Sequence, residues 1–338
     1  MAKKRCNRYS GIGGQAVLEG IMMKNKDRYA VAVRKPNGEI EVKTEQYEGI
    51  MGDSKLVKIP FIRGVFNFVD SLVLGTKTLN YSASFYEDEE AEETKFDKAM
   101  DKIFKGKAES FLIGLTTVIS IVLAVAIFMV LPFFLVSLLG NYVRNASLLA
   151  IIEGVLRILI FIVYILLISC TKDIKRVFMY HGAEHKCINC IEKGRPLTVK
   201  DVMRSSRQHK RCGTSFLLFV MLVSVVLFFF IRVDSPLQRL GLRILLIPVI
   251  AGISYEIIRL AGRSNNILVR IISAPGMWLQ KLTTKEPTPD MVEVAIKSVE
   301  AVFDWKAYLK ETFDYDVDDS WLKDTTDPED DFELNSHE

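Results

Sequence analysis

Three of the four histidines of this chain lie close together in the sequence, at His181, His185 and His209. The first two form the pattern His-x-x-Glu-His with Glu184, and on a helix these positions share one face. Two imidazoles and one carboxylate in this order match a zinc-enzyme motif, in which the histidines bind Zn²⁺ and the glutamate activates water. The spacing therefore predicts His181 and His185 as metal ligands and Glu184 as a general base.

A third ligand has to come from elsewhere, and the neighbouring cysteines supply candidates. Cys187 and Cys190 form Cys-x-x-Cys, and His209 and Cys212 form His-x-x-Cys further along the chain. This spacing also suits a structural zinc site with cysteine and histidine ligands. Glu256 is a further candidate, because an ionisable group near the end of an apolar segment is a functional hypothesis by default. We therefore expect Cys190, His209, Cys212 or Glu256 to complete a Zn²⁺ site.

Each of these residues also has a purely structural interpretation. The histidines and Glu184 could form the polar face of a helix beside a membrane. Cys187 and Cys190 could be small apolar packing residues. Glu256 could pair with Arg259 or with an arginine of a neighbouring helix. The five cysteines are odd in number, and three of them lie near histidines, so reduced thiols are expected rather than a disulfide framework.

Long apolar segments in the middle of the chain explain why 49% of its residues are hydrophobic. A helix needs about 20 predominantly apolar residues to cross a bilayer. Segments of that kind cover 111–140, 148–169, 214–231 and 240–260, the last interrupted by Pro248. The sequence therefore predicts an α-helical polytopic membrane protein with a small N-terminal α+β cytoplasmic part.

The distribution of basic residues predicts how these helices are oriented. The segment 171–212 holds eleven lysines and arginines, whereas the two short connections hold few. Loops rich in lysine and arginine stay on the cytoplasmic side of a membrane. We therefore expect a multi-pass protein of the cell membrane with both termini and the central segment in the cytoplasm. The histidines, Cys212 and Glu256 would then meet near the inner membrane face.

The N-terminal residues predict a β unit followed by a helix. Runs at 29–34 and 39–47 flank Asn37-Gly38, and Asn-Gly between alternating runs is a strong hairpin signal. The glycines of 9–22 lack the Gly-Lys-Ser of a phosphate loop. They predict a tight turn into a strand. The other possibility is that glycine lets the backbone approach the metal site closely. Segment 60–80 is apolar at helical spacing but carries charges, which favours an interfacial helix.

The remaining segments complete the predicted organisation. Ala274-Pro275-Gly276 predicts a turn, and an amphipathic helix is expected near 289–303. The acidic residues at 87–94 predict a solvated linker. The predicted parts are a cytoplasmic N-terminal part (1–100), a transmembrane hairpin (101–170), a cytoplasmic loop with the metal motif (171–213), a second transmembrane hairpin (214–262), a cytoplasmic C-terminal part (263–310) and an acidic tail (311–338).

Four long motifs connect the chain to a known family. They are GGQAVLEGIMM (13–23), YHGAEHKCINCIEKG (180–194), SRQHKRCGTSF (206–216) and SAPGMWLQKLTTKEP (273–287). In these motifs the chain resembles the YqhQ-like family of uncharacterised bacterial membrane proteins, which are described as predicted metal-dependent enzymes. The resemblance spans nearly the whole chain and implies a membrane location and a bound metal. It favours Cys190 over Cys187 as a ligand and implies no particular substrate.

Two functions follow from these observations. The first is a membrane-bound, zinc-dependent hydrolase that attacks an amide or ester delivered at the cytoplasmic membrane face. The alternative is a non-catalytic membrane scaffold in which a structural metal staples the loop 171–213 and a cytoplasmic partner binds the soluble parts. The expected partners are the lipid bilayer and an unknown cytoplasmic partner or membrane-delivered substrate.

Other classes are disfavoured by charge. Transport pathways normally carry ionisable groups at mid-depth, and the apolar segments hold few. The net charge of +3 gives no indication of nucleic-acid binding. The basic run 204–211 predicts attraction to the anionic inner leaflet, or contact with a phosphate of a substrate.

Overall fold

The computed structural model describes residues 9–52, 54, 59–86, 108–140, 142–143, 145–231, 233, 235–263 and 266–314. The predicted acidic linker and almost all of the predicted acidic tail lie outside the described residues. The chain divides into two compact units, each assembled from separate parts of the sequence. The first comprises Met1–Tyr86, Leu167–Phe219 and Ala251–Glu338, and the second comprises Glu87–Leu166 and Val220–Ile250.

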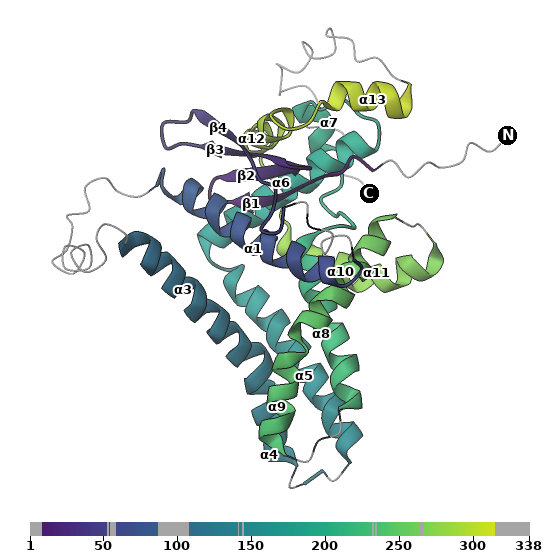
Figure 1. The fold of residues 1–338 in the computed structure, drawn as a ribbon. Helices are drawn as coiled ribbons and strands as arrows, with labels where there is room; N and C mark the ends of the chain where they lie inside the picture. The colour runs from purple at the N-terminus through teal and green to yellow at the C-terminus, as the bar shows by residue number, and fades with distance from the viewer. Residues whose placement is uncertain are drawn as a thin grey trace. The chain divides into compact units, whose positions relative to one another are not determined.

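A four-stranded antiparallel sheet with the order β1-β2-β3-β4 forms the N-terminal part of the first unit (Figure 1). The predicted hairpin is confirmed as β3 and β4, in which Arg34 pairs with Ile40. Gly38, in the turn between them, has a φ of 88°, a left-handed conformation that glycine adopts without a Cβ clash. The strands are β1 (Ile12–Val17), β2 (Gly20–Asn25), β3 (Arg28–Arg34) and β4 (Ile40–Gln46).

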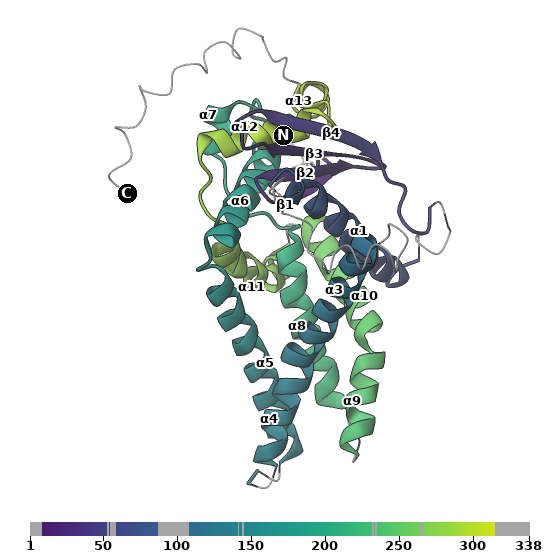
Figure 2. The ribbon, with the colours of Figure 1, turned by 90° about the vertical axis from the view of Figure 1, so that its left-hand side faces the viewer.

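Helices cover both faces of this sheet. Successive side chains of a strand point to opposite faces, so each face has its own set of packed residues. Helices α6 (Lys172–Glu192) and α12 (Pro289–Glu300) pack on one face, and α1 (Ile62–Ala83) packs on the other (Figures 1 and 2). The core toward α6 and α12 includes Ile21, Met23, Ala30 and Ala32 from the sheet, and the core toward α1 includes Met22, Tyr29, Val31 and Val33.

The C-terminal helices differ in one respect from the sequence-based expectation. The predicted amphipathic helix is confirmed as α12, but the predicted turn at 274–276 is wrong, because α11 (Ile267–Thr283) continues through Pro275. A proline inside a helix removes one backbone hydrogen bond. Burial of the following turn offsets that loss, since Gln280 is inaccessible to solvent and Gly276 lies against Ser215.

Long apolar helices account for the four predicted segments. Among the described residues, three helices are long and apolar enough to cross a membrane, or four if α9 and α10, bent by 43°, count as one. The bend lies beside Pro248, consistent with the predicted interruption. The helices are α3 (Ala108–Val125), the π-helix η2 (Ala126–Val130), α4 (Leu131–Leu139), α5 (Ala146–Ile168), α8 (Gly213–Phe230), α9 (Pro236–Leu245) and α10 (Ile247–Arg263).

A buried ion cluster joins three of these helices within the second unit. Glu153 of α5 accepts hydrogen bonds from Arg243 of α9, at 2.5 and 2.8 Å, and from Arg157 one turn further along α5, at 2.8 Å. Arg157 also donates to Ser224 of α8 at 2.8 Å. All three charged side chains are less than 10% exposed. The cluster therefore places two cations and one anion among apolar helices.

Candidate metal centre

His181 and His185 lie one turn apart on α6, with ring centroids 4.4 Å from each other. The thiol of Cys212, immediately before α8, lies beside them, with its Sγ 3.2 Å from Nε2 of His181. The candidate ligand atoms of these three residues all lie within 4.8 Å of one another. One metal ion could therefore contact all three after small adjustments, since zinc–ligand bonds measure about 2.0–2.3 Å.

Two backbone carbonyls orient the imidazoles. Nδ1 of His181 lies 2.9 Å from the carbonyl oxygen of Thr283, and Nδ1 of His185 lies 2.7 Å from that of Arg207. A carbonyl can only accept a hydrogen bond, so each Nδ1 carries the proton. In the neutral form of each ring the lone pair is then on Nε2, which is the usual arrangement for a histidine that binds a metal.

A close backbone approach brings Thr283 to His181. The chain after α11 runs along α6, where the Lys285 amide donates to the Phe178 carbonyl at 2.9 Å. Gly182 allows this approach, because a Cβ at its position would lie only 2.0 Å from the carbonyl oxygen of Lys285. The glycine inside the His-x-x-Glu-His pattern therefore positions the carbonyl that orients the first histidine.

The segment 206–212 is held against two helices by the side-chain amides of Gln280, which is buried, and Asn189, which is half-buried. Gln280 of α11 accepts from the His209 amide at 2.8 Å and donates to the His209 carbonyl at 2.7 Å. Asn189 of α6 donates to the carbonyls of Ser206 and Gln208, at 2.6 and 2.9 Å. These contacts fix both the Arg207 carbonyl and the position of Cys212.

The surroundings of Cys212 favour its thiolate. The amide of Thr214, in the first turn of α8, donates to its Sγ at 3.4 Å, and a helix N-terminus stabilises negative charge. Burial opposes the charge, yet His181 and His185 outweigh burial and hold the pKa of Cys212 well below its ordinary value. Burial likewise lowers the pKa of His181, but the neighbouring thiolate outweighs it and raises that pKa to about 9. The thiolate is the form that binds metals.

Glu184 lies on α6 between the two histidines and is 5% exposed. Burial raises the pKa of its carboxyl, while His181 and His185 lower it less strongly. The backbone of Gly14 in β1 lies close to this carboxyl, since a Cβ at Gly14 would lie 3.2 Å from the Glu184 Cδ. The N-terminal glycines thus bring backbone close to the candidate metal site. This is the close approach that the sequence allowed as an alternative to a simple turn.

The chain is similar to known proteins over most of its length. Residues 59–305 match the model of the family "Protein of unknown function (DUF1385)". The chain belongs to this family. It is also 36% identical to "Uncharacterized protein YqhQ" of Bacillus subtilis (strain 168) over 287 residues, which cover 85% of this chain and 90% of that protein. No solved structure matches the chain.

His209 lies next to the three-residue group without joining it. Its ring centroid is 5.8 Å from that of His185, and its Nε2 lies 3.4 Å from a carboxylate oxygen of Glu192. Arg211 also pairs with Glu192. Burial lowers the pKa of His209, so a neutral ring is expected near pH 7. His209 therefore lies beside the candidate metal centre and is not one of its three ligand residues.

Cys190 and Glu256 lie in other surroundings. Cys190 is inaccessible to solvent, belongs to the core between the sheet, α6 and α12, and donates to the carbonyl of Pro196 at 3.2 Å. Burial raises its pKa to about 12, which disfavours the thiolate. Glu256 forms an ion pair with Arg63 of α1 and accepts from the Phe61 amide at 3.3 Å. The structure brings neither residue to the histidines.

The groups that orient the ligands could not be identified from residue types. The carbonyls of Thr283 and Arg207 are backbone atoms, which no residue type indicates. Gln280 carried a signal, since a glutamine between apolar positions of an amphipathic helix indicates a buried hydrogen-bonding role.

Proposed function

We propose that this protein is a membrane-embedded metalloenzyme that holds Zn²⁺ through His181, His185 and Cys212 and hydrolyses an amide or ester at the cytoplasmic membrane face. The observation that carries the proposal is the grouping of three ligand atoms within 4.8 Å, with both Nδ1 atoms already bonded to carbonyls. Two imidazoles and a thiolate are ligands that zinc prefers.

The number of ligands favours catalysis over a purely structural site. Structural zinc sites usually have four protein ligands, whereas catalytic sites have three and keep one position open. In the part of the chain that the structure describes, the group of closely spaced histidine, cysteine and carboxylate atoms has three members. A substrate or water could take the remaining position.

Glu184 is the residue we assign to proton transfer. When bound, the metal ion would act as a Lewis acid that lowers the pKa of a coordinated water toward about 7. A carboxyl whose pKa is raised by burial is better matched to taking up and releasing a proton near neutral pH.

Membrane insertion is supported by the exposed surface of the long helices. Large apolar side chains remain exposed along them, for example Val118 at 57%, Val122 at 62% and Leu167 at 66%. Such surface is stable in lipid and unfavourable in water. The basic segment 171–212 connects two of the candidate spans, so we assign this segment and the metal centre to the cytoplasmic side.

Cobalt substitution tests whether the proposed site has an open position. The full-length protein would be purified in detergent, loaded with Co²⁺ and followed by visible absorption. We expect a thiolate-to-cobalt band that disappears in Cys212→Ala, and a spectral change when acetohydroxamate is added. Glu184→Gln should retain the band, because Glu184 is not assigned as a ligand.

The alternative is a structural metal that staples the cytoplasmic loop. It is favoured by the low exposure of His185 and Cys212, at 1% and 4%, since a closed site has no need of access. A cobalt band that acetohydroxamate leaves unchanged would support this alternative. A protein that gives no thiolate-to-cobalt band would contradict both functions.

A further inference from the structure

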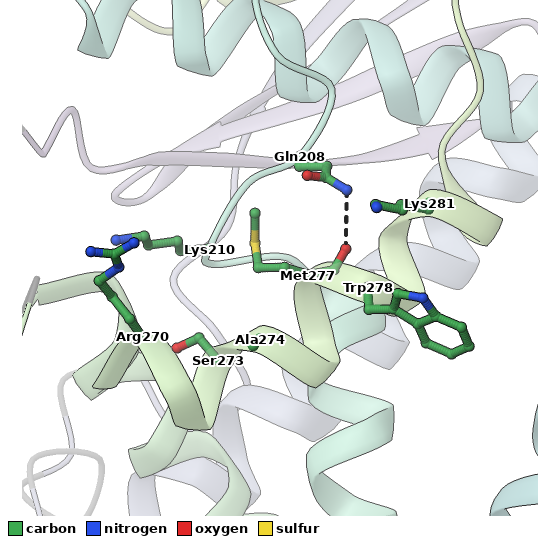
Figure 3. Close-up of a pocket in the computed structure, with 8 residues that line it drawn as sticks. All are labelled: Gln208, Lys210, Arg270, Ser273, Ala274, Met277, Trp278 and Lys281. Carbon is green, nitrogen blue, oxygen red and sulfur yellow. Dashed lines mark hydrogen bonds between the residues drawn. The ribbon is translucent and has the colours of Figure 1, made fainter. Parts of the chain in front are cut away.

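A basic pocket lies on α11 and the adjoining segment 206–212. Its volume is about 320 Å³, and eight residues line it (Figure 3). The residues that matter here are Gln208, Lys210, Arg270, Ser273, Trp278 and Lys281. The metal-centre residues are not among those lining it.

Three of the lining residues are cations, and none is acidic. Figure 3 shows the charged ends of Lys210 and Arg270 together on one side of the pocket, with Lys281 on the other. Lys210 and Arg270, whose charged ends lie together, create a positive potential that attracts an anion. The planar guanidinium of Arg270 can donate two parallel hydrogen bonds to a phosphate, and Lys210 can supply a point charge.

The helix that carries the pocket has an exposed apolar surface. Ile267 and Ile271 are both 63% exposed and Trp278 is 53% exposed, although all three are large hydrophobic residues. This helix begins soon after α10, which ends a candidate span. A helix with apolar residues and tryptophan beside lysine and arginine is typical of the membrane interface.

We propose that Lys210 and Arg270 form a binding site for a phosphate group, supplied by the headgroup of an anionic lipid. The cations match the charge of the phosphate, and the apolar residues of α11 match acyl chains beside it. The site is separate from the metal centre and goes beyond the proposed hydrolytic function. Loss of metal binding would therefore leave this proposal standing.

Short-chain lipids allow the proposal to be tested on the full-length protein in a neutral detergent. The probes are dihexanoyl phosphatidylglycerol, dihexanoyl phosphatidylcholine and inorganic phosphate, with affinities measured by isothermal titration calorimetry. We expect phosphatidylglycerol to bind more tightly than phosphatidylcholine. Arg270→Gln and Lys210→Gln should each weaken its binding roughly fivefold, since one basic group near anionic lipid contributes about 1 kcal/mol.

Two control variants separate charge from damage to the fold. Arg270→Lys keeps the charge but loses the parallel hydrogen bonds, so its affinity should lie between those of wild type and Arg270→Gln. Lys297→Gln removes an exposed cation from α12, away from the pocket, and should bind like wild type.

The soluble phosphate probe separates the two sources of the group. If inorganic phosphate binds as tightly as phosphatidylglycerol and the pocket variants weaken both, the phosphate site stands and its lipid source is overturned. Equal affinities of wild type, Arg270→Gln and Lys210→Gln for phosphatidylglycerol would overturn the site itself.

Discussion

Gly182 sets the geometry of the candidate metal centre through the side chain that it lacks. It lets the backbone at Lys285 approach α6, and that approach places the Thr283 carbonyl on Nδ1 of His181. Mutating residues that orient metal ligands typically lowers the metal affinity about 10- to 100-fold.

Replacing Gly182 by alanine should therefore weaken metal binding by about 10- to 100-fold without removing a ligand. The added Cβ would have to displace the Lys285 carbonyl, 2.0 Å away, and the carbonyl of Thr283 would move with it. Competition with a chelator of known affinity measures this loss. Gly13→Ala is the matched control, since a Cβ there meets nothing within 4 Å. Equal metal affinities of the two variants would contradict the role of Gly182.

Glu192 should make the stability of the fold sensitive to acid. Burial opposes its charge, but His209 and Arg211 outweigh burial and lower its pKa from 4.5 to about 2. A carboxyl with a lowered folded-state pKa stabilises the fold above its unfolded-state pKa, and this contribution is lost as the pH falls from about 4.5 toward 2. This contribution to the free energy of unfolding is on the order of 3 kcal/mol.

Thermal unfolding of wild type and Glu192→Gln between about pH 6 and pH 3 tests the direction of this pH dependence of stability. The wild type should be the more stable protein at the upper end, and its advantage should shrink on acidification. An advantage that grows as the pH falls would contradict the assignment.

At the scale of the elements, the packing of α5, α8 and α9 depends on the carboxylate of Glu153. Glu153 is the anion that pairs with both Arg157 and Arg243, and both arginines also lie over the ring of Phe228, at 5.0 and 4.9 Å from its centroid. Neutralising it would leave two buried cations without their anion. Breaking a buried ion pair in this way costs about 3–5 kcal/mol.

Glu153→Gln should thus lower the unfolding temperature of the detergent-solubilised protein markedly. Glu293→Gln is a fitting control, because its pair with Arg34 is half exposed and such pairs contribute about 0–1 kcal/mol. A Glu153→Gln protein as stable as the control variant would show that the cluster does not hold the helices together.

The elements with strong periodic signals could be predicted from the sequence. The apolar segments, the β3–β4 hairpin and α12 were all indicated by composition, spacing and Asn-Gly. The turn expected at Pro275 was wrong, because packing of α11 around Gln280 and Gly276 outweighs a local proline signal. Local propensity cannot register contacts between residues that are far apart in sequence.

The candidate site was accessible to sequence reasoning only in part. Helical spacing indicated that His181, Glu184 and His185 would lie together, and they do. The choice among Cys190, His209, Cys212 and Glu256 could not be made, because it depends on the path of 206–212 along α6 and α11. That path is fixed by Asn189 and Gln280, whose partners are backbone atoms.

At the scale of the whole molecule, we predict a topology. Three or four of the helices that the structure describes are long and apolar enough to cross a membrane, and the basic segment 171–212 should remain in the cytoplasm. An even number of crossings then places both termini on the same side.

Reporter fusions test this topology. Alkaline phosphatase is active only outside the cytoplasm and green fluorescent protein fluoresces only inside it. Fusions after residue 195 and at the C-terminus should fluoresce and lack phosphatase activity. A phosphatase-active C-terminal fusion would indicate three crossings and would contradict the predicted topology.

The central claim is that His181, His185 and Cys212 share one metal ion. It is tested most directly by elemental analysis of the purified full-length protein beside His185→Ala, Cys212→Ala and the control Cys190→Ala. We expect one zinc ion per chain in the wild type and in Cys190→Ala, and loss of the metal in the other two variants. Stoichiometric metal in both His185→Ala and Cys212→Ala would contradict the shared site.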